Sequence, residues 1–549
     1  MKKHQHIHSH LMSFFKPWMV LTLFFICNNS NHVIAQNWNQ IIKTVPSDRG
    51  AADEFGFSVA ISGDYAIVGA YLEDEDTTGG NTLSSAGAAY ILKNISGTWT
   101  EVQKLVPSDR GAADEFGFSV AISGNYAIVG AIGEDEDTTG GNTLSSAGSA
   151  YIFRNNLGSW TEVQKLVASD RNFDDGFGYS VAITRDYAII GARSEDQDTL
   201  GRNTIAQAGS AYIFENNTGT WSELQKIVAS DRGIFDFFGS SVAISNDYAI
   251  VGAIYEDQDT SGGNTLADAG SAYIFKNNSG TWSQAQKLVA SDRSSADYFG
   301  WSVAISGDFV IVGAIGEDHD TSGANAISDA GSAYIFSFSS GAWHEEQKLV
   351  ASDRGANDNF GNSVAISGET AIVGAPLEDQ DTSGANLLTE AGSAYIFKKS
   401  LGAWSEVQKI VASDREANDY FGYAVAISGD YVIVGARLED EDTTGSNTRN
   451  SAGSAYIFNK SLTVGIAESS FGELLKVYPN PTKGDFSIDL GNTYENTQVF
   501  ITDITGRLVE SKTLTQSRVL DLSIEAPAGI YLVSIQAGNK RAVIRLVKE

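Results

Sequence analysis

The chain has 549 residues, and its 68 acidic residues outnumber its 37 basic ones, which gives a formal charge of −31. This excess argues against nucleic acid as a partner, because proteins hold nucleic acid mainly through Lys and Arg on phosphates. The single cysteine, Cys27, and five of the seven histidines fall before residue 36, so thiol and histidine chemistry have very few candidates.

Residues 1–35 are typical of a secretory signal peptide. Three lysines accompany an apolar segment of ten residues, Trp18–Cys27, which is too short to cross a bilayer as a helix of about 20 residues. We expect cleavage before Gln36 and no transmembrane span. Loss of three bases and no acid takes the formal charge from −31 to −34, and residues 471–549 are neutral, with nine acids and nine bases. The whole excess therefore falls on residues 36–470, and its end marks a domain boundary.

Seven units of 61 residues make up this acidic region. Phe-Gly recurs at 55–56, 116–117, 177–178, 238–239, 299–300, 360–361 and 421–422, and Gly-Ala recurs at 69–70, 130–131, 191–192, 252–253, 313–314, 374–375 and 435–436. Self-similarity at a fixed period is the signature of a repeat architecture.

Each unit contains four strand signals and no helical period. In the first unit they are FGFSVAIS (55–62), YAIVGA (65–70), AGAAYILK (86–93) and WTEVQKLV (99–106), and Gly63-Asp64 forms a hairpin turn between the first two. Four antiparallel strands, repeated seven times, predict an all-β fold: a seven-bladed β-propeller.

The position of the recurrent tryptophan predicts how the ring closes. A Trp opens the fourth strand at 99, 160, 221, 282, 343 and 404, but the seventh expected position, 465, is Gly. Counting back 61 residues from Trp99 reaches Trp38. The N-terminal strand is therefore expected to supply the missing outer strand of the last blade.

The Phe-Gly and Gly-Ala pairs in register resemble FG-GAP repeats, the propeller repeats of integrin α-chains and of many secreted bacterial proteins. The resemblance covers about residues 38–460, although only residues 374–376 carry the full Gly-Ala-Pro. It implies a propeller over 36–460, and a linker over 461–470 would follow it.

Residues 471–549 resemble the type A sorting domain of type IX secretion. The matching features are Tyr478-Pro479-Asn480-Pro481, Gly506-Arg507, Gly529-Ile530-Tyr531-Leu532 and the terminal RLVKE. This resemblance implies a small β-sandwich that interacts with the type IX secretion machinery. It also implies that the sandwich is removed, or used for surface attachment, after passage through the outer membrane, so we expect a secreted or cell-surface protein.

An acidic loop follows each Gly-Ala pair, and the seven loops hold 24 of the 68 acids. In the first, Asp74, Asp76 and Thr78 precede Gly79 with the spacing of a hard-cation loop, and carboxylates gathered this closely repel one another unless a cation offsets them. The loops therefore predict calcium as a cofactor. In the third unit Leu200 breaks the pattern, so the predicted ligands come from the other six units: Asp74, Asp76, Thr78, Asn81, Asp135, Asp137, Thr139, Asn142, Asp257, Asp259, Ser261, Asn264, Asp318, Asp320, Ser322, Asn325, Asp379, Asp381, Ser383, Asn386, Asp440, Asp442, Thr444 and Asn447.

The resemblance does not supply these ligands. In integrin-like repeats the calcium loop lies between the Phe-Gly and Gly-Ala strands, whereas that connection is only Ser-Gly-Asp in this chain. The alternative interpretation is a solvated acidic loop that Asx and Thr turns cap.

A second recurrent cluster precedes each Phe-Gly pair: Ser47, Asp48, Arg49 and Asp53 in the first unit. We interpret it as a repeated ion pair or turn clamp between neighbouring blades. In an antiparallel blade this segment and the acidic loop open on one face, which is expected to be strongly negative. The recurrent Trp is interpreted as packing between blades rather than as a platform for sugars.

These features favour a secreted or surface-held propeller that binds or adheres to an extracellular protein or glycan and is not an enzyme. One alternative is a carbohydrate-active hydrolase or lyase on the same scaffold, since acid-rich chains readily supply two carboxylates. An active site usually breaks the symmetry of a repeat, whereas these units differ mainly at scattered exposed positions. The other alternative is a purely structural component of a surface matrix.

Overall fold

The computed structural model describes residues 36–462, 471, 475–503, 507–538 and 540–549. The predicted leader and nearly all of the predicted linker lie outside these residues. The chain forms two compact units, one of Gln36–Ser461 and one that holds Leu462–Glu549. Every regular element of the described segments is a β-strand. These segments contain no helix that is long and apolar enough to cross a membrane.

Each sequence unit folds as four antiparallel strands that pair in chain order. The first blade consists of β2 (Ser58–Ser62), β3 (Tyr65–Ala70), β4 (Ala88–Ile95) and β5 (Thr98–Leu105). Pairing of Ser62 with Tyr65 closes the predicted hairpin at Gly63-Asp64. The middle strands β3 and β4 are buried because neighbouring blades cover both of their faces, whereas β5 alternates between buried and exposed residues at the outer edge.

Five further blades repeat this order, and a seventh begins with β26 (Phe421–Ser428) and β27 (Tyr431–Ala436). The strands of the five are β6 (Phe116–Ser123), β7 (Tyr126–Ala131), β8 (Ser149–Asn156), β9 (Ser159–Leu166), β10 (Phe177–Ile183), β11 (Tyr187–Ala192), β12 (Ser210–Asn217), β13 (Thr220–Ile227), β14 (Phe238–Ile244), β15 (Tyr248–Ala253), β16 (Ser271–Asn278), β17 (Thr281–Leu288), β18 (Phe299–Ser306), β19 (Phe309–Ala314), β20 (Ser332–Ser339), β21 (Ala342–Leu349), β22 (Ser363–Ser367), β23 (Thr370–Ala375), β24 (Ser393–Ser400) and β25 (Ala403–Ile410).

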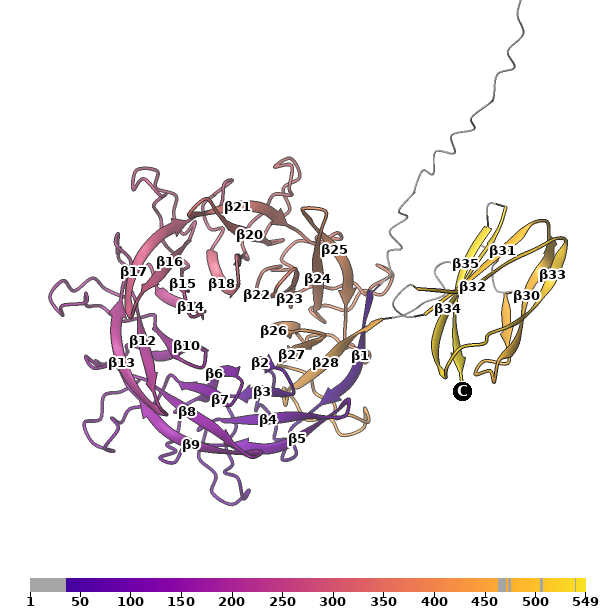
Figure 1. Ribbon diagram of the computed structural model, residues 1–549. Coiled ribbons are helices and arrows are strands. Elements are labelled where there is room, and N and C mark those ends of the chain that lie inside the picture. The colour runs from indigo at the N-terminus through magenta and orange to yellow at the C-terminus, as the bar shows by residue number, and fades with distance from the viewer. Residues whose placement is uncertain (1–35, 463–470, 472–474, 504–506, 539) are drawn as a thin grey trace, which may run out of the picture. The chain divides into compact units, whose positions relative to one another are not determined.

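The N-terminal strand closes the ring, as the position of Trp38 predicted (Figure 1). The seventh sheet has the order β1-β28-β27-β26, so β1 (Gln36–Thr44) is its outer strand beside β28 (Ser454–Leu462). A parallel bridge between Phe55 and Gly453 joins the first and last blades in the same way that Phe116 and Gly87 join the first and second. The propeller is therefore a closed ring of seven blades.

Close backbone contacts around the axis explain the two recurrent dipeptides. A Cβ atom on Gly69 would lie 2.0 Å from the carbonyl oxygen of Gly117 in the next blade. Gly117 has a φ of 97°, and a Cβ atom there would lie 2.3 Å from the carbonyl oxygen of Ala88. A side chain at either position would force the inner strands of adjacent blades apart, so only glycine fits.

The hydrophobic core lies between successive blades. At the junction of the first two, Ile67 packs with Phe116 and Trp160 of the next blade, and the Trp160 ring meets Tyr65 edge to face at 5.5 Å. The Gln103 side-chain amide accepts a hydrogen bond from the Trp160 N–H at 2.9 Å and donates one to the Trp160 carbonyl at 2.6 Å. The recurrent tryptophan thus packs between blades, as predicted.

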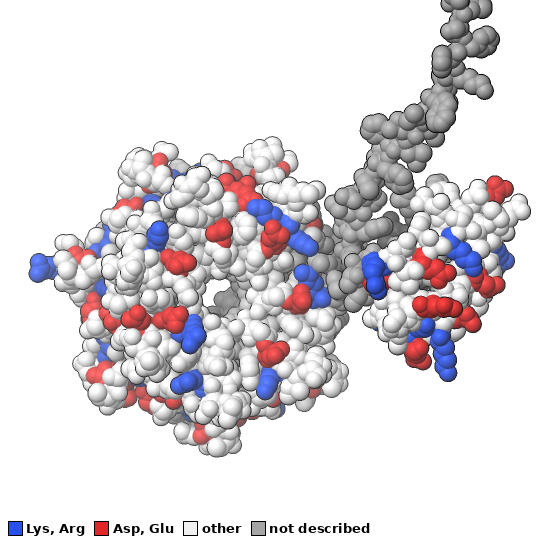
Figure 2. Space-filling model, in the orientation of Figure 1, with Lys and Arg blue, Asp and Glu red and all other residues white. Residues whose placement is uncertain are grey.

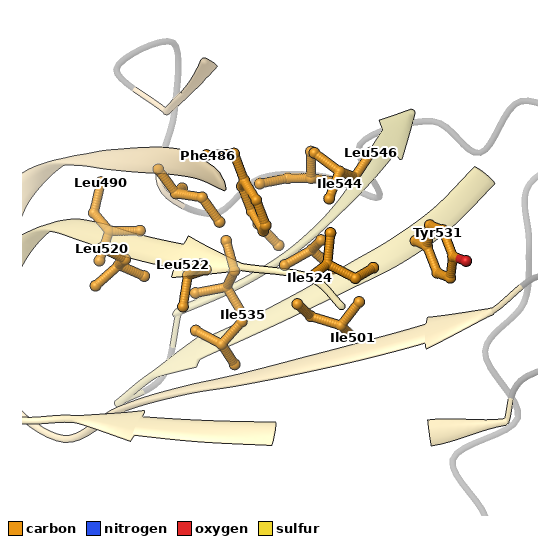
Figure 3. Packing of buried hydrophobic residues seen from close by; sticks show 14 of the residues in the cluster. Phe486, Leu490, Ile501, Leu520, Leu522, Ile524, Tyr531, Ile535, Ile544 and Leu546 are labelled. Carbon is orange, nitrogen blue, oxygen red and sulfur yellow. The ribbon is translucent and has the colours of Figure 1, made fainter. Parts of the chain in front are cut away.

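The C-terminal unit is a small β-sandwich. One sheet contains β29 (Lys476–Tyr478), β30 (Asp485–Tyr494) and β33 (Ser517–Ser523), and the other contains β31 (Thr497–Asp503), β32 (Leu508–Leu514), β34 (Gly529–Ala537) and β35 (Lys540–Lys548). Alternating apolar residues of both sheets, such as Phe486, Ile501 and Ile544, form the core (Figure 3). Asn480 of the Tyr-Pro-Asn-Pro motif pairs with the backbone of Arg545 and Val547 in the last strand.

Candidate functional site: the acidic-loop face

One end of the propeller carries two kinds of loop, which together define the acidic-loop face. The acidic loops join the second and third strands of a blade, and the junction loops join one blade to the next; in the first blade they span residues 71–87 and 106–115. Arg110 of the junction loop donates hydrogen bonds to the carbonyl oxygens of Asp74 and Asn81, at 2.9 and 3.1 Å. Arg49 contacts Asp440 and Asn447 of the last blade in the same way. The predicted clamp between neighbouring blades is confirmed, and it acts through backbone carbonyls.

A buried ion network lies beneath each acidic loop. Glu73, the first acid of its run, is only 1% exposed. The Lys104 Nζ atom lies 2.6 Å from Asp48 and 3.4 Å from Glu73, and the Tyr90 hydroxyl lies 2.9 Å from both carboxylates. Every blade holds an equivalent lysine with two acids, and in the last one β1 supplies it as Lys43.

The sequence interpretation missed this network. It placed Glu73 in a loop predicted to bind calcium or, as the alternative, to be solvated, and it gave no role to the Lys or the Tyr, although both recur every 61 residues. That recurrence was the signal available, because a lysine that repeats in step with a buried strand needs an anionic partner.

A second buried carboxyl group adjoins each network. Asp53 accepts a hydrogen bond from the N–H of Gly50, and burial, reinforced by the charge of Glu73, raises its pKa to about 7. The pKa is raised to about 7 or 8 at the equivalent residues Asp114, Asp175, Asp236, Asp297, Asp358 and Asp419. Since these groups are partly neutral at pH 7 and the buried Glu residues face lysines, the face is less negative than its acid count suggests.

The predicted calcium ligands take part in turns of their own loop. Asp76 accepts hydrogen bonds from the N–H and the hydroxyl of Thr78, both at 2.7 Å, and these bonds lower its pKa to about 2. Asp74 accepts from the N–H of Ser85 at 2.7 Å, and the Asn81 carbonyl accepts from Arg110. The structure thus brings the Asp76 and Thr78 oxygens together.

The other predicted sets show the same pattern. In each of them the second Asp accepts a hydrogen bond from the N–H of the Thr or Ser two residues later; these are Asp137, Asp259, Asp320, Asp381 and Asp442. The first Asp accepts a hydrogen bond from the backbone N–H eleven residues later; these are Asp135, Asp257, Asp318, Asp379 and Asp440. Among the described residues, the group of three acids with oxygens within 4.8 Å of one another is Asp48, Glu73 and Glu75, which does not contain a predicted ligand. In each blade the Arg and Lys side chains already bring positive charge to this region. Calcium binding stays a prediction.

Near the propeller axis, the same face carries aromatic residues. The position after Phe-Gly holds Tyr423, Phe57, Phe118 and Tyr179 in four consecutive blades, and their ring centroids are 5.2, 5.0 and 5.1 Å apart. Arginines cover both ends of this axial arc, since the Arg437 guanidinium lies 4.5 Å from the Tyr423 centroid and that of Arg193 lies 3.9 Å from Tyr179. Figure 2 shows an opening at the axis of the ring.

A second aromatic group lies in the fourth and fifth units, around Phe237, Tyr255, Tyr298 and Trp301. The corresponding positions elsewhere hold residues such as Glu54, Gly133 and Asn362. Some of the differences between units therefore lie together on one face and are not scattered over the propeller. The search for recurrent residues missed them, and a comparison of the junction loops position by position would have found them.

Comparison with known proteins yields two family matches. Residues 38–92, 99–153, 160–214, 221–275, 282–336, 343–397 and 404–458 match the FG-GAP repeat model, and residues 476–549 match the secretion system C-terminal sorting domain. Each repeat match begins at the outer strand of one blade and ends in the third strand of the next. No curated protein matches the chain. A chain of the solved structure titled "Crystal Structure of Mitotic Checkpoint Complex" is 11% identical, covering 83% of this chain and 99% of its own, with a TM-score of 0.43, too low to bear on the fold.

Proposed function

The chain belongs to the FG-GAP repeat family, and from this premise we propose that it is a non-catalytic binding or adhesion protein that holds an extracellular protein or glycan on its acidic-loop face. Its C-terminal sorting domain makes it a secreted or outer-surface propeller that interacts with the type IX secretion machinery.

The observation that carries the proposal is the contrast between repeated and unrepeated residues. The clamp arginines, the network lysines and the interblade tryptophans recur in all seven blades, as a scaffold requires. The aromatic and arginine residues of the acidic-loop face are not shared by all seven units. Tyr71 is the one aromatic residue at its position, and Arg193 has an arginine equivalent only in Arg437. The position of Trp301 is aromatic in four of the other six units. Tyr, Trp and Arg are the residues that most often anchor partners at interfaces.

The buried titratable groups support a non-catalytic role. Carboxyl groups with raised pKa values are often catalytic, but here each of them adjoins a lysine network that every blade repeats. A group that all blades share is more readily explained by the needs of the fold than by one active site.

The test is binding of the labelled secreted chain to arrays of glycans and of extracellular proteins. We expect saturable binding that unlabelled protein displaces. Turnover of a bound glycan would favour a carbohydrate-active enzyme instead. Self-association without any ligand would favour a structural matrix component.

A further inference from the structure

Five aromatic residues form a continuous band on the acidic-loop face of the fourth and fifth blades. The ring centroids are 6.4 Å apart for Phe235 and Phe237, 5.4 Å for Phe237 and Tyr255, 5.6 Å for Tyr255 and Tyr298, and 6.4 Å for Tyr298 and Trp301. We call these five residues the aromatic sector. They come from two junction loops, one acidic loop and the inner strand β18, so only the folded ring brings them together.

The fold does not require this apolar surface. Ile234 is 66% exposed and Phe235 is 52% exposed, whereas the first two units have Ala-Ala at the same positions. Phe235 and Phe237 have positive φ values of 65° and 54°, as the equivalent residues of every unit do, and bulky residues are rare in this region of backbone conformation. Exposed apolar groups in strained positions are typical of contact sites for a partner.

Acidic groups without a basic partner border the sector. The Tyr298 N–H donates to the carbonyl of Asp268 at 3.2 Å. Burial raises the pKa of Tyr298, and the charges of Asp268 and Asp329 raise it further. Within the described segments, neither of these carboxylates lies within ion-pair distance of a Lys or Arg. Their equivalents in the first two units are serines, Ser85 and Ser146. Blades four and five therefore add negative charge where they add aromatic rings.

The rings of this region already accept one cation of the protein. The Arg193 guanidinium lies 3.9 Å from the Tyr179 centroid and 5.4 Å from that of Phe237. Guanidinium and ammonium groups are attracted to the faces of aromatic rings, and nearby carboxylates attract the same cations. An acidic partner would meet uncompensated carboxylates at the edge of the sector, whereas a basic one would neutralise them.

We infer that the aromatic sector is a docking site for a basic polypeptide, which places apolar or aromatic anchors on the rings and Lys or Arg side chains beside Asp268 and Asp329. This inference rests on the proposed binding function and names the chemistry of its partner. The partner is recognised through both kinds of contact. A peptide that has only basic side chains, or only aromatic ones, should therefore bind weakly.

The test uses the full secreted chain and three labelled 12-residue synthetic peptides, which alternate Lys with Trp, Lys with Ser, and Glu with Trp. We expect fluorescence anisotropy to show that the Lys/Trp peptide binds at least about tenfold more tightly than either of the others. Equal binding by the Glu/Trp peptide, or by the Lys/Ser peptide, would overturn the inference.

Substitutions with residues from sister units separate the sector from the rest of the surface. Ile234→Ala with Phe235→Ala introduces the Ala-Ala pair of the first two units, and Asp268→Ser with Asp329→Ser introduces their serines. Each pair should weaken Lys/Trp binding about tenfold. The matched control is Leu157→Ser with Leu401→Ser, fully exposed residues in turns at the opposite end of the blades, where other units carry Ser. Unchanged affinity in the sector variants, or an equal loss in the control, would overturn the inference. Array binding that survives the sector changes would still leave the proposed binding function standing.

Discussion

At the scale of single residues, the lysine in each blade solves a problem of desolvation. Moving a carboxylate such as Glu73 out of water costs several kcal/mol unless a countercharge and hydrogen bonds accompany it. The Lys104 ammonium and the Tyr90 hydroxyl supply both. Removing the ammonium would leave a buried negative charge without a countercharge.

Lys165→Met is therefore expected to lower the free energy of unfolding by about 3–5 kcal/mol, the usual cost of breaking a buried ion pair. Lys165 lies 2.8 Å from Asp109 and 3.3 Å from Glu134. Urea denaturation followed by tryptophan fluorescence measures the change. Adding Glu134→Gln should recover part of the loss, because the uncompensated charge is then gone.

Asp430→Ala provides the control for this prediction. The Asp430 side chain is 74% exposed and lies 3.8 Å from Lys460, so solvent screens the pair. The denaturation midpoint should barely move. If Lys165→Met were equally mild, the buried network would not be a source of stability.

The seven Asp53-type carboxyl groups predict how stability depends on pH. Their pKa values rise from 3.8 to about 7 or 8 in the folded state, so the folded protein binds more protons than the unfolded chain between these limits. The stability that they contribute is fully present below pH 3.8 and is lost as the pH rises through 7 and 8. We expect a higher melting temperature at pH 5.5 than at pH 8.5, measured by circular dichroism.

Asparagine at these positions supplies the control for the pH effect. Asp114→Asn with Asp236→Asn keeps the acceptor for the backbone N–H and cannot ionise. The difference between the two pH values should shrink in this variant. A melting temperature that climbs from pH 5.5 to 8.5 in the unchanged protein would contradict the assignment.

At the scale of elements, the strand that closes the ring is the one most distant in sequence from its sheet. Trp38 of β1 is 3% exposed, and its backbone pairs with the Gln408 amide at 2.7 and 2.8 Å. Trp38→Ala would leave a cavity and should cost about 3–5 kcal/mol.

Hydrogen exchange locates this effect. Loosening β1 exposes the edge of β28, so the amides of β28 should exchange faster in Trp38→Ala while those of β12 keep their protection. Trp221→Ala serves as the comparison, because there the outer strand β13 remains joined to its blade by a short turn. Unchanged exchange in β28 would mean that closure does not depend on Trp38.

Strand periodicity was sufficient to predict the blades, whereas the loops depended on contacts between units. The alternation in FGFSVAIS and WTEVQKLV placed the strands, and Trp38 placed the closure. The acidic run was predicted to be a calcium loop, with a solvated loop as the alternative, because spacing alone does not show that Glu73 turns inward to Lys104 while Asp76 caps a surface turn. That division is decided by the neighbouring strand and the clamp arginine of the next blade.

At the scale of the molecule, the distribution of charge differs from its total. Lys and Arg are interspersed with Asp and Glu on the face of the propeller shown in Figure 2. Many acids of the acidic-loop face form ion pairs inside the protein. The negative charge that a partner contacts therefore comes mainly from exposed groups such as Asp76 and Asp259, whose hydrogen bonds lower their pKa values and keep them ionised.

A thermal melt of the secreted chain, first in EDTA and then in millimolar calcium, tests the calcium prediction. Ligand that binds only the folded state at a hundredfold excess over Kd adds about 2.7 kcal/mol per site, so the sequence prediction is a rise of many degrees. Replacing Asp74, Asp76 and their equivalents in the other five predicted units by Asn should abolish the rise in melting temperature. No shift would mean that the arginines and lysines of the blades are sufficient to offset the carboxylates.

The sequence by itself determined the number of blades, the closing strand and the sorting domain, because each follows from local periodicity or from a motif that repeats at a fixed interval. Only the tertiary structure decided which acids are buried, where the lysines lie, and that Phe235, Tyr255 and Trp301 share one surface. The physical reason is that burial and ion pairing arise from contacts between neighbouring blades. These contacts join residues of different units, and the repeat pattern does not show which residues meet.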